Sequence, residues 1–352
     1  MHFDPIENMI LYPAIEIDSI EEKLHDISPS LLNFSRYVRG GDFIIRINLH
    51  TDSDHIAEFF SSNWALLPPP ADCEIEEADL FHISNWSVCE SASIPVRKRI
   101  VGRNRRISAI TGGEFYSNAK VMIRGLCSAI AAQRGASGFM HGASMSIHDK
   151  GVVITGASGS GKTTATGEMI SRFPNSAKII NDDWGWAAPG ETGIQFTGEQ
   201  AIHIKKSSIE SLFGMSRPTL QIDLAENFYH NENSNSARIL APRNELFKNI
   251  SADYSHFDFL FVLTRENSMP FYARKMTKDD LHVIEQAEFS KFYQSKEKFM
   301  DGSLLILNHD EYLLQKMKFL SIIEKTNCVH INNTGSKLQL GNAITNFISE
   351  KF

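Results

Sequence analysis

The sequence has few cysteines, no long apolar run and no excess of basic residues. Its four cysteines are scattered and form no CxxC pair, which argues against a disulfide scaffold and against a zinc site made of clustered thiolates. The apolar run at residues 121–132 contains Arg124 and is too short to span a bilayer. The first residues carry acids and prolines, unlike a signal peptide. We therefore expect a soluble cytoplasmic protein with no membrane among its partners.

Charge is close to balanced over the 352 residues. Lysine and arginine total 35 against 42 for aspartate and glutamate, which gives a net charge of −7. A mildly acidic chain is not built as a general polyanion binder, so we expect no nucleic-acid partner, and any anion site must come from local geometry. Hydrophobic residues make up 42% of the chain, which is enough to fill the core of one large or two ordinary domains.

The first third of the chain is dominated by strand-like patterns. Residues 42–49, 74–83 and 97–110 mix β-branched and polar residues, and the prolines at 68–70 separate two of these segments. Apolar residues then recur at helical spacing over residues 114–133. We predict an N-terminal α+β, mainly β, domain at residues 1–134 that serves recognition or regulation and ends in a connecting helix.

The pattern changes after the glycines at 135 and 138. A short apolar strand is predicted at residues 151–155, a helix at 162–172 and a second strand at 177–180. A β-α-β unit of this length implies a sheet covered by its crossover helix. We also expect strands at residues 257–263 and 304–307, and helices at 278–293 and 342–351. Residues 135–352 are therefore assigned to a second, α/β domain.

A glycine-rich segment between the predicted strand and helix matches the phosphate-loop pattern GxxxxGK[ST]. Glycines let several backbone N–H groups point into one concavity, and the helix N-terminus adds partial positive charge. Lys162 would contact the β- and γ-phosphates, and the Thr163 hydroxyl would bind Mg²⁺. The alternative is a glycine-rich turn that fits the pattern by chance. The predicted nucleotide-binding residues are Gly156, Ala157, Ser158, Gly159, Ser160, Gly161, Lys162, Thr163 and Thr164.

Two adjacent carboxylates, Asp182 and Asp183, follow the second strand of this unit. Ligands of open α/β sheets bind at the carboxyl ends of the strands. One carboxylate could hold Mg²⁺ while the other accepts a proton from an attacking hydroxyl. Which aspartate takes which role stays open, and the alternative for the pair is an acidic surface turn.

The run HGASM…GVVITGASGSGKTTATGEMI…KIINDDWGW resembles the superfamily of HPr kinases and phosphoenolpyruvate carboxykinases. HPr kinases have a His-Gly before the loop strand and an Asp-Asp pair soon after the loop, which match His141-Gly142 and Asp182-Asp183. Residues 236–242 are similar to the carboxykinase segment that carries a phosphate-binding arginine, which would make Arg238 the partner of the γ-phosphate. The resemblance covers roughly residues 135 to 270.

The resemblance implies a P-loop-containing, HPr-kinase/carboxykinase-like mixed sheet core, with ATP and Mg²⁺ or Mn²⁺ as cofactors. Residues 135–352 would then form an ATP-binding kinase domain, and His141 would lie beside the metal and the phosphates. Thr164 stands where HPr kinases carry an acidic residue, which points to an acceptor other than HPr. The implied catalytic residues are Asp182, Asp183, Lys162, His141 and Arg238, and the implied metal ligands are Thr163, Asp182 and Asp183.

The function expected from these patterns is that of an ATP-dependent kinase, a phosphotransferase. It would transfer the γ-phosphate to a hydroxyl of a protein or peptide serine or of a small molecule, and a homo-oligomer is compatible with the resemblance. Three alternatives stay open: a carboxykinase-like lyase, a non-catalytic ATP-binding regulator, and an NTPase coupled to motion or assembly.

Overall fold

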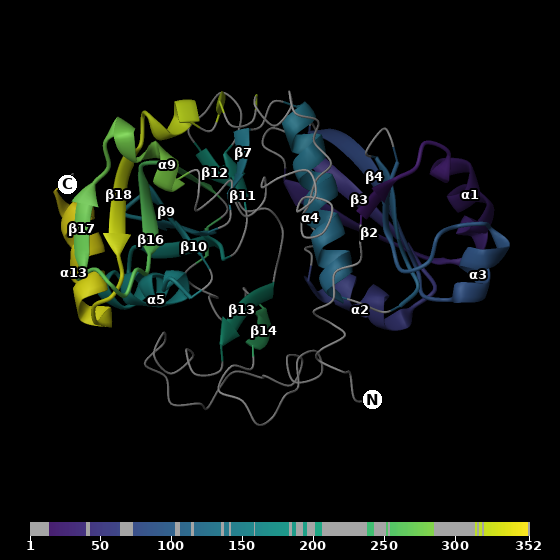
Figure 1. Cartoon of the computed structure of the whole chain (residues 1–352), viewed down its shortest axis with the longest axis horizontal. Coiled ribbons are helices and arrows are strands. Elements are labelled where there is room, and N and C mark those ends of the chain that lie inside the picture. The colour runs from purple at the N-terminus through teal and green to yellow at the C-terminus, as the bar shows by residue number, and fades with distance from the viewer. Residues whose placement is uncertain are drawn as a thin grey trace. The chain divides into compact units, whose positions relative to one another are not determined.

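The computed structural model describes two compact units, the first from β1 to α4 and the second from β7 to α13 (Figure 1). Both units combine helices with sheets that contain parallel and antiparallel pairs, so the fold is mixed α/β. The described residues are 14–39, 43–63, 73–102, 106–113, 116–134, 137–140, 142–157, 159–182, 185–187, 193–195, 201–205, 238–242, 251–252, 254–284, 314, 317–318 and 320–350.

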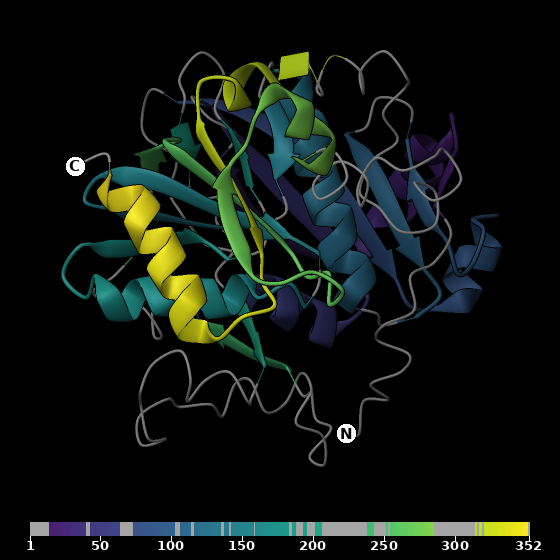
Figure 2. The same cartoon turned by 60° about the vertical axis from the view of Figure 1, so that its left-hand side comes forward.

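The first unit is built on a six-stranded sheet with the order β1-β5-β6-β4-β3-β2. Its strands are β1 (Ala14–Glu16), β2 (Leu32–Arg39), β3 (Phe43–Thr51), β4 (Glu74–Ile83), β5 (Arg99–Val101) and β6 (Ile107–Thr111). Its helices are α1 (Ile20–Ile27), the 3₁₀ turn η2 (Ser28–Ser30), α2 (Asp54–Asn63), α3 (Trp86–Ser91) and α4 (Tyr116–Gln133). Helices α1 and α3 lie on one side of this sheet and α2 and α4 on the other (Figures 1 and 2).

The second unit contains a six-stranded main sheet with the order β10-β8-β9-β16-β18-β17. Its strands are β8 (Gly142–Ile147), β9 (Lys150–Gly156), β10 (Ala177–Asn181), β16 (Phe259–Thr264), β17 (Tyr272–Lys275) and β18 (Asn327–Asn332). Strands β9, β16 and β18 are parallel. Because β8 is antiparallel to both β9 and β10, β10 runs in the same direction as β9 but is separated from it by β8.

Two helices cover one face of the main sheet: α5 (Lys162–Arg172) and α13 (Lys337–Ser349). Figure 2 shows them crossing on this face. Apolar residues at helical spacing on both helices, such as Ala165, Met169, Leu340 and Ile344, pack on alternate residues of the strands, such as Ile154. The hydrophobic burial holds the start of α5 against the end of β9.

The second unit has further strands outside the main sheet. Four of them form a sheet with the order β15-β12-β11-β7, and two pair as β13 and β14. They are β7 (Ser137–Met140), β11 (Gly185–Ala187), β12 (Gly193–Gln195), β13 (Ala201–Lys205), β14 (Arg238–Pro242) and β15 (Tyr254–His256). The unit also contains the 3₁₀ turn η3 (Lys278–Asp280) and the short helix α9 (Leu281–Ile284).

Most of the predicted strands and helices that fall on described residues are confirmed. The strands at 74–83, 151–155 and 177–180 correspond to β4, β9 and β10, and the helix predicted at 162–172 is α5. The segments 42–49, 114–133 and 257–263 fall largely within β3, α4 and β16. The β-α-β unit is present, with its two strands parallel but not adjacent.

Other predicted boundaries differ from the structure. The strand-like segment 97–110 contains two antiparallel strands, β5 and β6. The last helix begins at Lys337, five residues before the predicted start, because Ser336 and Gln339 form a capping box. Only η3 and α9 are described within the predicted helix 278–293, and the predicted strand at 304–307 lies outside the described residues. Within the described part of the chain, none of the helices has the length and apolar content needed to cross a bilayer.

Candidate functional site

Four strands of the main sheet end at one edge, which we call the carboxyl edge. Strands β9, β10, β16 and β18 share one direction, so the residues that follow them gather there. The glycine loop, residues 156–161, begins at the last residue of β9, and Asp182 follows β10. Thr264 ends β16, and Asn333 follows β18. Ligands of open α/β sheets bind outside this edge.

The glycine loop has a backbone that only glycine adopts readily. Gly156, Gly159 and Gly161 have φ angles of 145°, 84° and 106°, values that are strained for residues with a Cβ. A Cβ at Gly156 would overlap the Leu263 carbonyl oxygen and lie 2.6 Å from Ser160 Oγ, whereas nothing lies within 4 Å of a Cβ at Gly159. The loop is therefore packed against β16 on one side and open at Gly159.

The loop is closed by a hydrogen bond of its own and leads directly into α5. The Ser160 N–H donates to the Ala157 carbonyl at 3.1 Å, and Gly161 is the N-cap of the helix. Ser160 Oγ is buried and has no hydrogen-bond partner within the described residues. The first backbone N–H groups of a helix have no intrahelical acceptor, so they and the helix dipole favour an anion at this end.

Lys162 places its ammonium group at the glycine loop. Lys162 Nζ donates to the Gly156 carbonyl oxygen at 2.6 Å and lies 3.4 Å from the Ala157 carbonyl oxygen. The side chain is partly buried, as are Thr163 and Thr164 in the first turn of α5. A positive charge, two hydroxyls and a helix N-terminus therefore meet within one turn of chain.

Asp182 is positioned by the buried residue before it. The main-chain N–H of Asn181 and its side-chain Nδ2 both donate to Ser144 Oγ, each at 3.1 Å. These bonds hold the end of β10 on β8, and Asp182 lies partly exposed immediately beyond. A carboxylate is thus placed at the same carboxyl edge as the glycine loop.

The ends of β16 and β18 add a buried histidine. His330 is 4% exposed, and its Nε2 lies 2.9 Å from Thr264 Oγ1 while its Nδ1 lies 3.5 Å from the Tyr272 hydroxyl. Burial, assisted by the charge of Arg274, lowers the pKa of His330. The neutral ring is therefore the form favoured here, which suits a hydrogen-bonding role between strands.

The predicted site residues fall into three groups. The described residues of the glycine loop, Lys162, Thr163, Thr164 and Asp182 lie at the carboxyl edge. The main chain of Arg238 lies in β14, paired with Lys205 of β13 and outside the main sheet, and its side chain is not described. His141, Ser158 and Asp183 lie outside the described residues.

The sequence patterns did not identify Asn332 and Asn333, which the structure places at the carboxyl edge. Asn332 is fully buried, and its Nδ2 donates to the carbonyl oxygens of Glu266, Met269 and Pro270. Asn333 Nδ2 donates to the Ser160 carbonyl in the glycine loop. The signal was the position of both residues at the end of an apolar segment, Cys328 to Ile331, that was not recognised as a strand.

Proteins similar to this chain are found among solved structures. No protein-family model matches the sequence, and no curated protein matches it. Among solved structures the chain is similar to the HPr(Ser) kinase/phosphatase from Coxiella burnetii, with 13% sequence identity and a TM-score of 0.21. The match covers 53% of this chain and 97% of that chain.

Proposed function

We propose that this protein is an ATP-dependent phosphotransferase that moves the γ-phosphate of ATP to a hydroxyl group. One observation carries the proposal. The segment with the GxxxxGK[ST] pattern lies between the end of the parallel strand β9 and the start of α5, and a carboxylate follows the parallel strand β10 at the same edge. A chance match to the pattern would not require this placement.

Phosphate binding would use the glycine loop, the start of α5 and Lys162. The positive φ angles of Gly159 and Gly161 allow consecutive N–H groups to face one anion. The ammonium of Lys162, now on the Gly156 carbonyl, would exchange that neutral acceptor for charged phosphate oxygens, which form stronger hydrogen bonds. The same groups would stabilise the charge that develops during transfer.

The donor set at the carboxyl edge fits Mg²⁺ or Mn²⁺. Thr163 and Asp182 offer hydroxyl and carboxylate oxygens, which are the ligands these ions prefer. Mg²⁺ is commonly held by one or two carboxylates together with phosphate oxygens. The ion, when bound, would offset phosphate charge.

The remaining catalytic roles are part of the proposal. Of Asp182 and Asp183, one would hold the metal and the other would accept the proton of the acceptor hydroxyl. His141 would lie beside the phosphates, and Arg238 would contact the γ-phosphate. The acceptor would be a protein, a peptide or a metabolite, and the first unit would take part in its recognition or in regulation.

The test is incubation of the full chain with γ-labelled ATP, Mg²⁺ and a cell extract. Label should move into protein or into a small molecule with the wild type, but not with Lys162→Ala. Lys178→Ala is the matched control, because Lys178 is an exposed lysine in β10 of the same sheet. Transfer retained in Lys162→Ala would contradict the proposal.

The same samples separate the alternatives. Phosphoenolpyruvate made from oxaloacetate and ATP would identify a carboxykinase-like lyase. Tight ATP binding without any labelled product would identify a regulator. Phosphate release that is independent of an acceptor would identify an NTPase. Each of these three results replaces the kinase proposal.

A further inference from the structure

We propose that Asn333 is a positioning residue that sets the orientation of the Ser160–Gly161 peptide in the glycine loop, and thereby the affinity for the triphosphate. The inference rests on the proposed function. Asn333 lies 173 residues from Ser160 in the sequence, and no part of the phosphate-loop pattern includes it.

The backbone at Asn333 is held by its own hydrogen bond and by those of the preceding residue. Its main-chain N–H donates to the Thr264 carbonyl at the end of β16 at 2.8 Å. The preceding residue, Asn332, is fully buried, and its Oδ1 accepts the Glu266 N–H at 2.8 Å. The Asn333 side chain therefore extends from an anchored backbone, with little freedom to leave the loop.

The side chain of Asn333 contacts one peptide group of the loop. Its Nδ2 donates to the Ser160 carbonyl oxygen at 2.7 Å. The same amide lies so close to Gly161 that a Cβ there would overlap it. The amide thus occupies the space beside the Ser160–Gly161 peptide at the point where α5 begins.

Holding this carbonyl also orients a backbone donor. In a trans peptide the C=O and the N–H point in opposite directions, and the described part of the chain contains no cis peptide. With the Ser160 oxygen turned toward Asn333, the Gly161 N–H points away from the Asn333 side chain. A carbonyl turned the other way would present its negative end to the phosphates, so Asn333 keeps an unfavourable dipole out of the site.

Two variants of Asn333 test this role, and a variant of the next residue is the control. Asn333→Ala removes the bond, and Asn333→Asp keeps the shape but replaces the donor with a second acceptor facing the Ser160 oxygen. Thr334→Ala is the control, because it loses one hydrogen bond from the same turn, from Thr334 Oγ1 to the Met269 carbonyl, without touching the loop. All are compared at a temperature at which circular dichroism shows them folded.

The expected result is a loss of ATP affinity and not of turnover. Asn333→Ala should raise the ATP dissociation constant and KM roughly tenfold, the usual effect of one hydrogen bond. Asn333→Asp should raise them by more, because two oxygens then repel. At saturating ATP, kcat should change by less than KM. Thr334→Ala should stay near the wild type.

A second measurement does not need the nucleotide. Amide hydrogen exchange in residues 159–162 should be faster in both Asn333 variants than in Thr334→Ala. If the wild type binds ATP and the Asn333 variants bind it equally well, this inference is wrong and the proposed function stands. If the wild type binds no ATP, the proposed function fails and the inference fails with it.

Discussion

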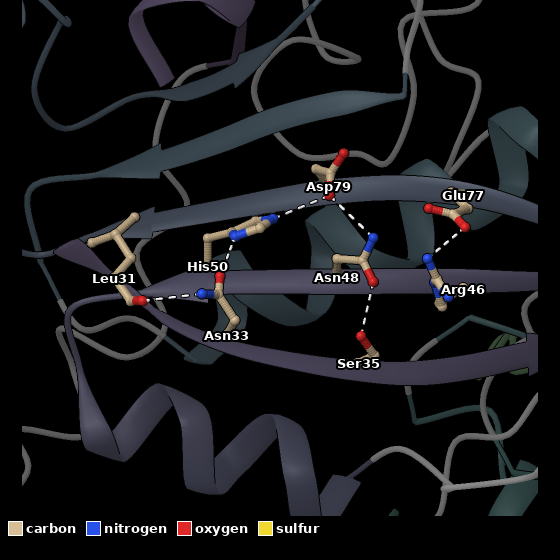
Figure 3. Close-up of polar contacts among 8 residues, drawn as sticks. All are labelled: Leu31, Asn33, Ser35, Arg46, Asn48, His50, Glu77 and Asp79. Carbon is tan, nitrogen blue, oxygen red and sulfur yellow. Dashed lines mark hydrogen bonds and ion pairs between the residues drawn. The ribbon is translucent and has the colours of Figure 1, made fainter. Parts of the chain in front are cut away.

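In the first unit polar side chains run across the middle of the sheet, whereas in the second they collect at the strand ends. Figure 3 shows the first arrangement on β2, β3 and β4. Ser35 Oγ donates to Asn48 Oδ1 at 2.8 Å, and Asn48 Nδ2 donates to Asp79 Oδ1 at 3.2 Å. Each of these side chains therefore bonds to a neighbour on the next strand.

The network continues through His50. Its Nε2 lies 3.1 Å from Asp79 Oδ1, and its Nδ1 contacts Asn33 Oδ1. Because Asn33 Nδ2 donates to the Leu31 carbonyl, the amide oxygen is the atom that faces the ring. Both ring nitrogens thus face acceptor oxygens, so the orientation of the ring is determined from two sides. The ring also stacks on Phe81, with centroids 4.4 Å apart.

The difference between the units shows which polar groups hold the fold and which are available to a ligand. Side chains in mid-strand pair across the sheet and stabilise the register of β2, β3 and β4. At the carboxyl edge of the second unit, Lys162 and the N-terminus of α5 present donors beyond the sheet. Substitutions in the first set should therefore change stability, and those in the second should change activity.

The largest expected effect is that of Lys162→Ala on phosphoryl transfer. Loss of the ammonium should reduce the rate by about 100-fold or more, because charge on the transferred phosphate is then less stabilised. The free energy of unfolding should change little, since the side chain is partly exposed. Label transfer and circular dichroism measure the two quantities. If Lys162→Ala lost stability and kept activity, Lys162 would belong with the residues that stabilise the fold and not with those that bind a ligand.

Asp79→Ala should give the opposite result, with stability lost and ATP binding kept. The carboxylate accepts bonds from Asn48 and His50, and its side chain is 29% exposed. Removing it should therefore cost about 1–2 kcal/mol. Hydrogen exchange of the β3 amides is the measurement, because two units need not unfold in one step. Unchanged exchange would show that the network is dispensable.

A pH dependence in the first unit should follow from the same carboxylate. Burial acts to raise the pKa of Asp79, but the hydrogen bonds from His50 and Asn48 outweigh it and hold that pKa below its ordinary value. A lowered folded-state pKa contributes stability above the unfolded pKa, near 3.9, and this is lost as the pH falls through the folded value. In the wild type, the protection of the β3 amides from hydrogen exchange should therefore decrease as the pH falls through this range. Asp79→Asn should make that decrease smaller. The same decrease in the variant and in the wild type would contradict this prediction.

The smallest expected effect belongs to the ion pair beside the network. Arg46 Nη2 lies 2.5 Å from Glu77 Oε1, with side chains 35% and 51% exposed. Exposed pairs contribute at most about 1 kcal/mol, so Glu77→Gln should leave β3 exchange close to the wild type. If Glu77→Gln lost as much stability as Asp79→Ala, the exposure of a side chain would not predict how much its contact contributes to stability.

Local patterns predicted the glycine loop and its flanking elements well. The strand, the glycines and the amphipathic helix follow one another directly in the sequence. Their patterns are therefore local, and β9 and α5 are correctly predicted. The antiparallel β8 between β9 and β10 was not predicted, because strand order depends on pairing between distant segments. Strand β18 was missed because its apolar segment, Cys328 to Ile331, is short.

The sequence alone predicted the glycine loop, since the GxxxxGK[ST] pattern is local and lies between a predicted strand and a predicted helix. It also determined that a carboxylate follows the next parallel strand. Only the tertiary structure decided that Asn333 meets Ser160, and that Asp79 and His50 meet across two strands. These contacts join residues far apart in the chain, and their partners are chosen by sheet register and packing, which no local pattern contains.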